Sequence, residues 1–408
     1  MEPIFTPEQL AEIRAYHAPI YARVVIGTLF DLALSFVILR FAIRPLWSLA
    51  GRLSGWTRTR LGWMQTAPGL RVPVQAARRL WKGEDALQSV WFANLHFFLL
   101  WGIALPRAFY FGYIHERRYG LSQESVWSWW SRGLLDTGIS ALATALLAFG
   151  LFGLARRTRH WWLLLGLGAG MALMGSALID PYRGTLHFEQ APLPEGPLRE
   201  RLLGVLEAAE VPVSEIRVRK TSVASERIQA VFAGQGPTRS VILNDVAVRE
   251  LDADALAAVV AHEAAHVHES RWPRTVMSFF ALLFLLWGAD RVMRRSAQRG
   301  WFSTSTFGDI RTLPLLLFLF SLVATPASLV SKAISREREL AADRYAVALT
   351  GAPETFRQML VKVARVNKMD PDPPRWIVLW GYSHPPLRER LEAVPMEPRP
   401  SSAHGVVR

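Results

Sequence analysis

Long runs of apolar residues alternate with short polar loops along most of the chain. Each run approaches the roughly 20 residues that an α-helix needs to cross the hydrocarbon core of a bilayer. The runs lie at about Ile20–Ile43, Ser89–Pro106, Leu134–Ala155, Trp161–Ile179, Pro273–Ala289 and Leu313–Val330. The pattern therefore predicts a mostly α-helical, polytopic membrane protein with about six transmembrane helices.

A different pattern occupies the middle of the chain, between the fourth and fifth apolar runs. Leu residues recur at helical spacing over Gly196–Glu210. Residues typical of strands then follow over Glu215–Lys220, Arg227–Ala233 and Arg239–Asn244, with Gly and Pro in the turn before the last strand. Asp252–Ser270 is Ala-rich and predicts a helix. We therefore expect a soluble α+β insert whose small meander has Arg227–Ala233 as an edge strand.

Composition narrows the classes of function. Lys and Arg number 47 against 34 Asp and Glu, which gives a net charge of +13. Most of this excess lies in short loops between apolar runs, and no basic stretch is interleaved with aromatic residues, so we expect no nucleic-acid partner. The chain has no Cys. Disulfides and thiolate metal sites are therefore excluded, which leaves His and carboxylates as candidate metal ligands.

One acidic residue, Asp31, lies inside the first apolar run. A charge at this depth is costly unless it faces polar groups. Two interpretations remain open. Asp31 lines a wet cavity, or it packs against a polar partner on another helix, such as His96.

An HExxH motif lies within the predicted helix Asp252–Ser270. His262 and His266 are four residues apart, so both imidazoles lie on one helix face and can bind one metal ion. Glu263 between them can reach a water molecule at that metal as general base. The rest of the helix is mostly Ala and Val, and polar side chains are costly there unless they have partners. The motif therefore predicts a zinc site.

Zinc used for hydrolysis takes a third protein ligand. Glu339 and Asp343 share one face of a predicted helix, Ser335–Leu349, so one could bind the metal while the other orients a ligand. Glu337 is the alternative ligand, because it lies about 200° from Glu339 around the helix and either face could point inward. The apolar stripe of the helix lies nearer Glu339 and Asp343.

His384 and Arg388 are one helical turn apart, and two prolines at the start of a short helix separate them. Such a pair could bind an oxyanion or a peptide carbonyl. The other interpretation is structural, since the prolines start a helix and Arg388 can pair with Glu392.

These motifs together resemble the integral-membrane zinc metallopeptidases of the type I CAAX prenyl protease family, which are gluzincins. The resemblance rests on HEAAH, on Ser-Arg-x-x-Glu-x-x-Ala-Asp ending at Asp343, and on His-Pro-Pro-Leu-x-x-Arg-Leu ending at Leu391. The segment from Leu105 to Ser125 is similar to that family's N-terminal signature. The HtpX-like membrane proteases are a more distant match, because they share only the catalytic half.

The resemblance implies one Zn²⁺ per chain. It assigns the metal to His262, His266 and Glu339, the catalytic base to Glu263, and the support of a ligand to Asp343. It also implies that His384 and Arg388 contact the transition state and the substrate.

The edge strand would bind an extended substrate, and the resemblance places Gln229, Ala230 and Phe232 there. The family typically has Asn where this chain has Gln229, so the substrate register is expected to differ. Eukaryotic members have seven spans, whereas six are predicted here.

We expect five regions along the chain. They are an N-terminal membrane region with four transmembrane helices (1–180), a soluble catalytic part with the sheet and the HExxH helix (181–272), two transmembrane helices (273–331), C-terminal catalytic helices with the third zinc ligand (332–394), and a flexible tail (395–408).

The expected function is that of a membrane-embedded zinc metalloendopeptidase that cleaves membrane-associated or lipid-modified, CAAX-type peptides and proteins. Its partners would be such a substrate and the lipid bilayer, and the Ala-, Arg- and Leu-rich composition favours a bacterial inner membrane. Two alternatives belong to other classes. One is a catalytically silent membrane scaffold or chaperone of the same fold, and the other is a transporter with a regulatory soluble module.

Overall fold

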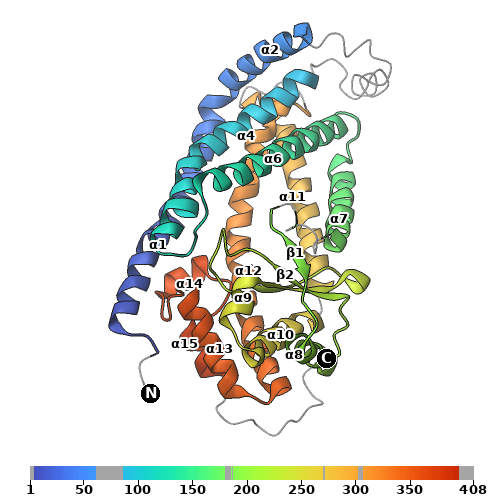
Figure 1. The fold of residues 1–408 in the computed structure, drawn as a ribbon. Helices are drawn as coiled ribbons and strands as arrows, with labels where there is room; N and C mark the ends of the chain where they lie inside the picture. The colour runs from blue at the N-terminus through green and yellow to red at the C-terminus, as the bar shows by residue number, and fades with distance from the viewer. Residues whose placement is uncertain are drawn as a thin grey trace.

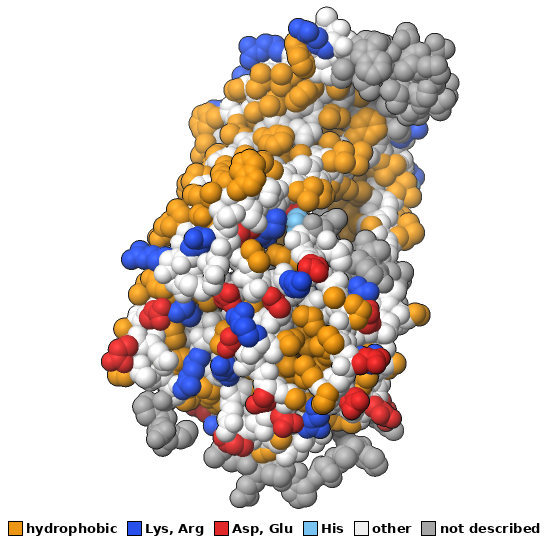
Figure 2. Space-filling model, in the orientation of Figure 1, with side chains coloured by type: hydrophobic (Ala, Val, Ile, Leu, Met, Phe, Trp, Pro, Cys, Tyr) orange, Lys and Arg blue, Asp and Glu red, His pale blue; other side chains and the backbone are white. Residues whose placement is uncertain are grey.

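The computed structural model describes residues 4–60, 86–179, 185, 187–269, 272–301 and 307–394. Long helices fill one half of the molecule, and a small sheet with shorter helices fills the other (Figure 1). Hydrophobic side chains dominate the surface of the long helices, whereas charged side chains of both signs gather over the other half (Figure 2). One half therefore suits contact with lipid, and the other suits contact with water.

Among the described residues, five helical segments are long and apolar enough to cross a membrane: Pro7–Arg60, Ala86–Arg118, Val126–Ala155, Thr275–Arg299 and Ile310–Thr350. Their main helices are α1 (Pro7–Val37), α2 (Ile43–Arg60), α4 (Ala86–Phe109), α6 (Val126–Ala155), α11 (Trp272–Arg299) and α12 (Leu313–Thr350). Five of the predicted spans are thereby confirmed. The remaining one forms α7 (Trp161–Ile179), but its described apolar part, Trp161–Ala172, is shorter than a span.

The first helix extends well beyond its predicted span. It begins at a capping box between Thr6 and Gln9. At its other end it passes through one π-helical turn, η1 (Ile38–Ala42), directly into α2. Residues 61–85, where a seventh span or a re-entrant segment was considered, lie outside the described residues.

Asp31 has an ionic partner on a neighbouring helix. Arg107, near the end of α4, donates to both carboxylate oxygens at 3.0 and 3.2 Å. The suggested pairing with His96 is wrong, because both ring nitrogens of that buried side chain lack a partner in the described part of the chain. A long Arg side chain reaches across the gap between helices, whereas an imidazole on the same helix does not.

The sheet has four strands in the order β1-β2-β4-β3. They are β1 (Gln190–Pro192), β2 (Glu215–Arg219), β3 (Ala230–Ala233) and β4 (Ser240–Asn244). The predicted meander is wrong, because β2 pairs in parallel with β4 and the chain crosses over between them. The hairpin of β3 and β4 does form, and it leaves β3 at the edge as expected.

A single helix replaces two predicted segments near the C-terminus. The span Leu313–Val330 and the separate helix Ser335–Leu349 are both parts of α12, which runs for 38 residues. Pro326 lies inside it, and Gly351 ends it with a left-handed φ of 63°. The last membrane helix therefore continues without a break into the soluble domain.

The HExxH helix, α10 (Ala253–His268), lies at the centre of the soluble domain. Asp252 caps it by accepting a hydrogen bond from the Ala255 N–H. Its buried Ala and Val side chains pack against α12, β3 and two further helices. Those are α8 (Pro197–Ala208) and α13 (Pro353–Val366), and the shorter helices α9 (Asp245–Glu250), α14 (Arg375–Gly381) and α15 (Leu387–Ala393) complete the domain. Small Ala side chains let these neighbours approach closely, which holds α10 firmly.

Candidate metal centre

Two histidines one turn apart on α10 face the same space. The ring centroids of His262 and His266 are 5.1 Å apart, with the rings nearly perpendicular. His262 is buried, and His266 is half-buried. The i, i+4 spacing therefore places both imidazoles side by side, as predicted.

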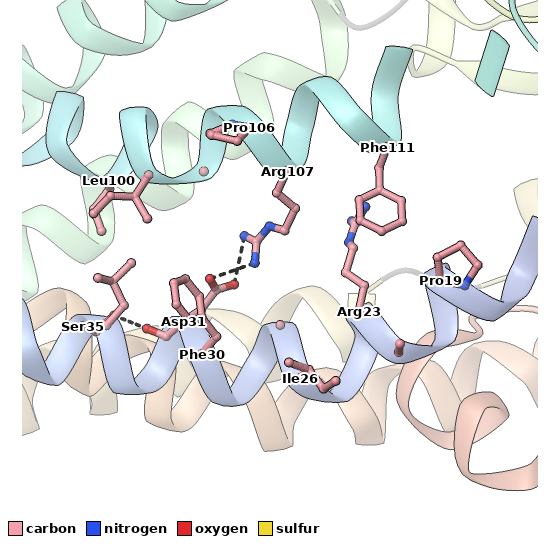
Figure 3. A pocket seen from close by; sticks show the side chains of 15 residues that line it. Pro19, Arg23, Ile26, Phe30, Asp31, Ser35, Leu100, Pro106, Arg107 and Phe111 are labelled. Atoms are coloured by element: carbon pink, nitrogen blue, oxygen red, sulfur yellow. Dashed lines mark hydrogen bonds and ion pairs between the residues drawn. The ribbon is translucent and has the colours of Figure 1, made fainter. Parts of the chain in front are cut away.

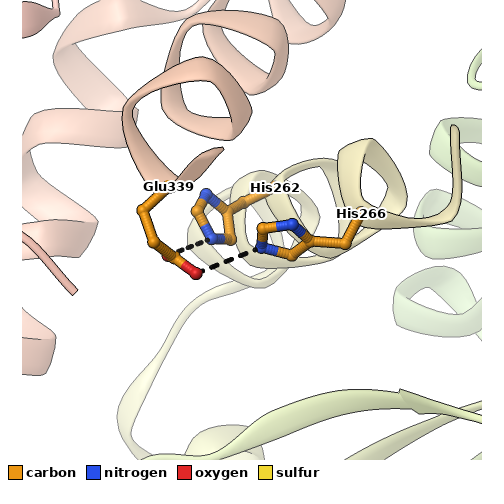
Figure 4. Close-up of side chains that lie close together, drawn as sticks. All are labelled: His262, His266 and Glu339. Atoms are coloured by element: carbon orange, nitrogen blue, oxygen red, sulfur yellow. Dashed lines mark ion pairs between the residues drawn. The ribbon is translucent and has the colours of Figure 1, made fainter. Parts of the chain in front are cut away.

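Glu339 approaches this pair from α12 (Figure 4). Its Oε2 lies 3.3 Å from His262 Nε2, and its Oε1 lies 3.5 Å from His266 Nε2. One donor atom from each of the three side chains lies within 4.8 Å of the other two. The alternative ligand Glu337 is exposed on the other side of α12.

The donor set fits a divalent metal ion. Glu339 Oε2 is buried, and no hydrogen bond of good geometry reaches it from the described residues. A buried carboxylate oxygen in this state is costly unless a cation satisfies it. Two imidazoles and one carboxylate are also the protein ligands of many hydrolytic zinc sites.

Further side chains hold the outer nitrogens of both histidines. Asp343 Oδ1 lies 2.9 Å from His262 Nδ1. Glu269 Oε1 lies 3.1 Å from His266 Nδ1, and Glu269 also pairs with Arg338. Such contacts fix the ring orientation and direct the inner nitrogen of each ring towards a metal.

Arg390, which the sequence interpretation missed, completes this shell. It donates to both oxygens of Asp343, at 2.8 and 2.5 Å. Burial opposes its charge, but the Asp343 carboxylate outweighs that cost and raises the pKa of Arg390. The motif ending at Leu391 contains an Arg at this position, and that was the available signal.

His384 and Arg388 are in different places. His384 Nε2 lies 3.4 Å from Glu339 Oε1 while 54% of the side chain is exposed, so it borders the metal site and solvent. Arg388 instead pairs with Asp372 and Glu392 and is 66% exposed. The geometry therefore brings His384 to the cluster but leaves Arg388 on the surface.

Glu263 has the environment of a proton acceptor. Among the described residues no hydrogen bond or ion pair engages its carboxylate. Burial raises its pKa, because the charged form loses water, and the nearby histidines oppose that shift. A carboxylate with a raised pKa is a better base for water than an ordinary Glu.

The edge strand β3 packs on α10, beside these side chains. The Gln229 main chain is already used, because its N–H and C=O both bond to Asn244. Since inward- and outward-facing residues alternate in an antiparallel pair, Val231 and Ala233 face β4, whereas the N–H and C=O groups of Ala230 and Phe232 face away from it. An extended peptide could therefore pair with Ala230 and Phe232.

These features define the class of a membrane metalloprotease. An HExxH helix and a carboxylate on a following helix form the metal site, and both are attached to a bundle of membrane helices. A family model described as peptidase family M48 matches residues 192–397. A second model, described as the CAAX prenyl protease N-terminal region with five membrane helices, matches residues 1–182.

The chain therefore belongs to peptidase family M48, within the group of CAAX prenyl protease-like membrane metalloproteases. It is a multi-pass membrane protein and a metal-dependent protease, so its substrates are peptides or proteins. These matches do not favour the transporter and silent-scaffold alternatives.

Known relatives cover most of the chain. It is 25% identical to "Uncharacterized metalloprotease YhfN" of Bacillus subtilis (strain 168) over 316 residues, which is 75% of this chain and 73% of the relative. It is 28% identical to "CAAX prenyl protease 1 homolog" of Oryza sativa subsp. japonica, over 71% of this chain and 69% of that protein. The crystal structure of S. mikatae Ste24p matches with a TM-score of 0.80 and 19% identity, over 96% of this chain and 90% of that one, and so shares the fold.

Proposed function

We propose that this protein is a zinc endopeptidase of a bacterial inner membrane that cleaves membrane-associated or lipid-modified, CAAX-type polypeptides. The main support is the cluster of His262, His266 and Glu339 beside a strand with free outward-facing main-chain groups. The relatives named as CAAX prenyl protease homologues support the class of substrate. The division into regions expected from the sequence is part of this proposal.

Substrate binding would begin at β3. Main-chain groups of Ala230 and Phe232 pair with an extended peptide, which lays the scissile bond across α10. The Gln229 side chain can add a hydrogen bond, while its main chain stays bonded to Asn244. The pose is then set by main-chain pairing, so the protein can accept varied side chains.

Catalysis would use three side chains around the scissile carbonyl. When bound, Zn²⁺ polarises the carbonyl and lowers the pKa of water. Glu263 takes a proton from the attacking water and returns it to the leaving amine. His384, next to Glu339, donates a hydrogen bond to the developing oxyanion. Asp343 and Arg390 hold His262 in place during these steps.

The test compares two peptides that differ only by a farnesyl group on one Cys. Full-length protein in detergent is assayed as wild type and as Glu263→Gln, and zinc content is measured for each. We expect the wild type to cleave the farnesylated peptide faster, and the Gln variant to bind zinc but to lose about 100- to 10,000-fold in kcat.

The outcomes separate the parts of the proposal. Equal, Glu263-dependent cleavage of both peptides would keep the endopeptidase and remove the lipid preference. Failure to cleave either peptide while zinc is bound would contradict the catalytic proposal itself.

A further inference from the structure

A cleft between α1 and α4 forms a cavity in the membrane half, away from the metal centre (Figure 3). Its volume is about 590 Å³, within the range of about 300–1,000 Å³ that is usual for ligand sites. Phe30 and Leu34 of α1 and Leu100 and Ile103 of α4 line much of it. The cleft is open, since Ile26 and Phe30 at its wall are 67% and 51% exposed.

Two cations and one anion lie in this otherwise apolar cleft. Arg107 is held by both oxygens of Asp31. The Arg23 guanidinium lies over the Phe111 ring, 4.8 Å from its centroid. Throughout the described ranges no carboxylate pairs with Arg23. The cleft therefore carries one positive charge in excess.

The two cations meet at Gly27. A Cβ placed on this glycine would lie 3.5 Å from Arg107 Nη1 and 3.6 Å from Arg23 Cγ. Both Arg side chains therefore pass over the same point of α1. Two guanidinium groups this close, with only one carboxylate between them, attract a second anion.

The charged and apolar residues are sorted along the cleft. Arg23 lies three residues inside the start of the first predicted span, and Arg107 directly follows the end of the second. Both lie at the membrane end that faces the soluble domain (Figure 1). Leu34 and Leu100 lie deeper in the same spans. The cleft is thus polar near the membrane surface and apolar towards the middle, as a lipid leaflet is.

We propose that this cleft binds an anionic phospholipid of the surrounding bilayer. Its phosphate would lie between Arg23 and Arg107, and one acyl chain would follow Phe30, Leu34 and Leu100. Guanidinium groups bind phosphate with paired N–H donors, and basic pockets between membrane helices recognise anionic headgroups. A zwitterionic lipid has the same chains but carries its own cation beside the phosphate, so it does not compensate the excess charge.

The test is native mass spectrometry of the full-length protein in detergent with either dioleoyl phosphatidylglycerol or dioleoyl phosphatidylcholine. The main variant is Arg23→Gln, which leaves no carboxylate without its partner. Arg14→Gln is the matched control, since Arg14 is an exposed cation of α1 outside the cleft. Leu100→Trp fills the apolar part, and Leu142→Trp makes the same change at an exposed position of α6.

We expect the wild type to retain phosphatidylglycerol over phosphatidylcholine, and Arg23→Gln to retain about fivefold less of it, whereas Arg14→Gln behaves as wild type. Leu100→Trp should lower retention, and Leu142→Trp should not. Equal retention of the two lipids by the wild type, or equal losses in Arg23→Gln and Arg14→Gln, would overturn the site. Unchanged retention in Leu100→Trp would overturn the placement of the acyl chain.

Discussion

The soluble domain and the membrane bundle bury their apolar residues in different ways. In the soluble domain one large core surrounds α10 and extends to the flanking helices and the sheet. In the bundle the fully buried apolar side chains, such as Phe92, Phe152 and Trp161, gather at the end far from the metal centre. Elsewhere the membrane helices expose Leu and Phe side chains, for example Phe280 and Leu147.

This difference follows from the two solvents. Lipid chains solvate exposed apolar side chains, so the bundle gains little from burying them in protein. The soluble domain has no such solvent and must pack densely, and that packing also holds the metal ligands in a narrow geometry. Changes near α10 should therefore impair chemistry, and changes at polar contacts in the bundle should impair stability.

The largest effect is expected from Glu339→Gln. Gln carries no charge and binds zinc weakly, so this variant should lose its metal and its peptidase activity. Glu337→Gln, on the exposed face of the same helix, is the control and should keep both. Metal analysis and peptide cleavage measure the outcome, and similar behaviour of the two variants would contradict the assignment of the third ligand.

The next effect concerns two arginines of α15. Arg390→Gln removes the partner of Asp343 and should weaken metal affinity by about 10- to 100-fold. Arg388→Gln changes an exposed side chain and should leave metal affinity near wild type. Competition with a chelator of known affinity compares the variants. A larger loss for Arg388→Gln would restore the role that the sequence interpretation gave to that residue.

A smaller effect is expected at the edge strand. Ala230→Pro removes an N–H that faces away from β4, where Pro is tolerated in an edge strand. Losing one substrate hydrogen bond should raise KM by about 2- to 10-fold with little change in kcat. Ala230→Gly keeps the N–H and serves as the control in steady-state assays. An equal KM for the two variants would speak against strand pairing by the substrate.

The smallest effect on activity is expected in the bundle. The Trp161 indole N–H donates to the buried carboxylate of Asp290 at 2.7 Å. Trp161→Phe removes this donor and should cost about 1–3 kcal/mol of stability. Thermal unfolding in detergent should show a lower Tm, whereas kcat of the folded protein should not change. A kcat that falls along with Tm would show that the two regions are coupled.

Local periodicity was enough to predict much of the centre. The spacing of His262 and His266 defines one helix face by itself, and Glu339 and Asp343 share a face for the same reason. The choice between Glu339 and Glu337 needed more, since each could face inward. Burial of Glu339 against α10 and exposure of Glu337 separate them, and both depend on how α12 packs.

Arg388 and Arg390 show where periodicity is insufficient. The buried stripe of α15 contains Leu387 and Leu391, and at 100° per residue the two arginines lie about 80° to either side of it. Only packing against α12, which brings Asp343 to one side, distinguishes them. The parallel pairing of β2 with β4 has a similar origin, because it joins segments that are distant in the sequence.

The continuity of α12 makes the metal centre sensitive to membrane geometry. Glu339 lies 13 residues beyond Pro326, or about 20 Å along the helix axis. Pro removes one main-chain hydrogen bond and makes bending easier at that point. A bend of about 3° there moves the Glu339 carboxylate by about 1 Å relative to the histidines of α10. Since helices tilt to match bilayer thickness, α12 acts as a lever through which lipid chain length can adjust the coordination distance of this ligand.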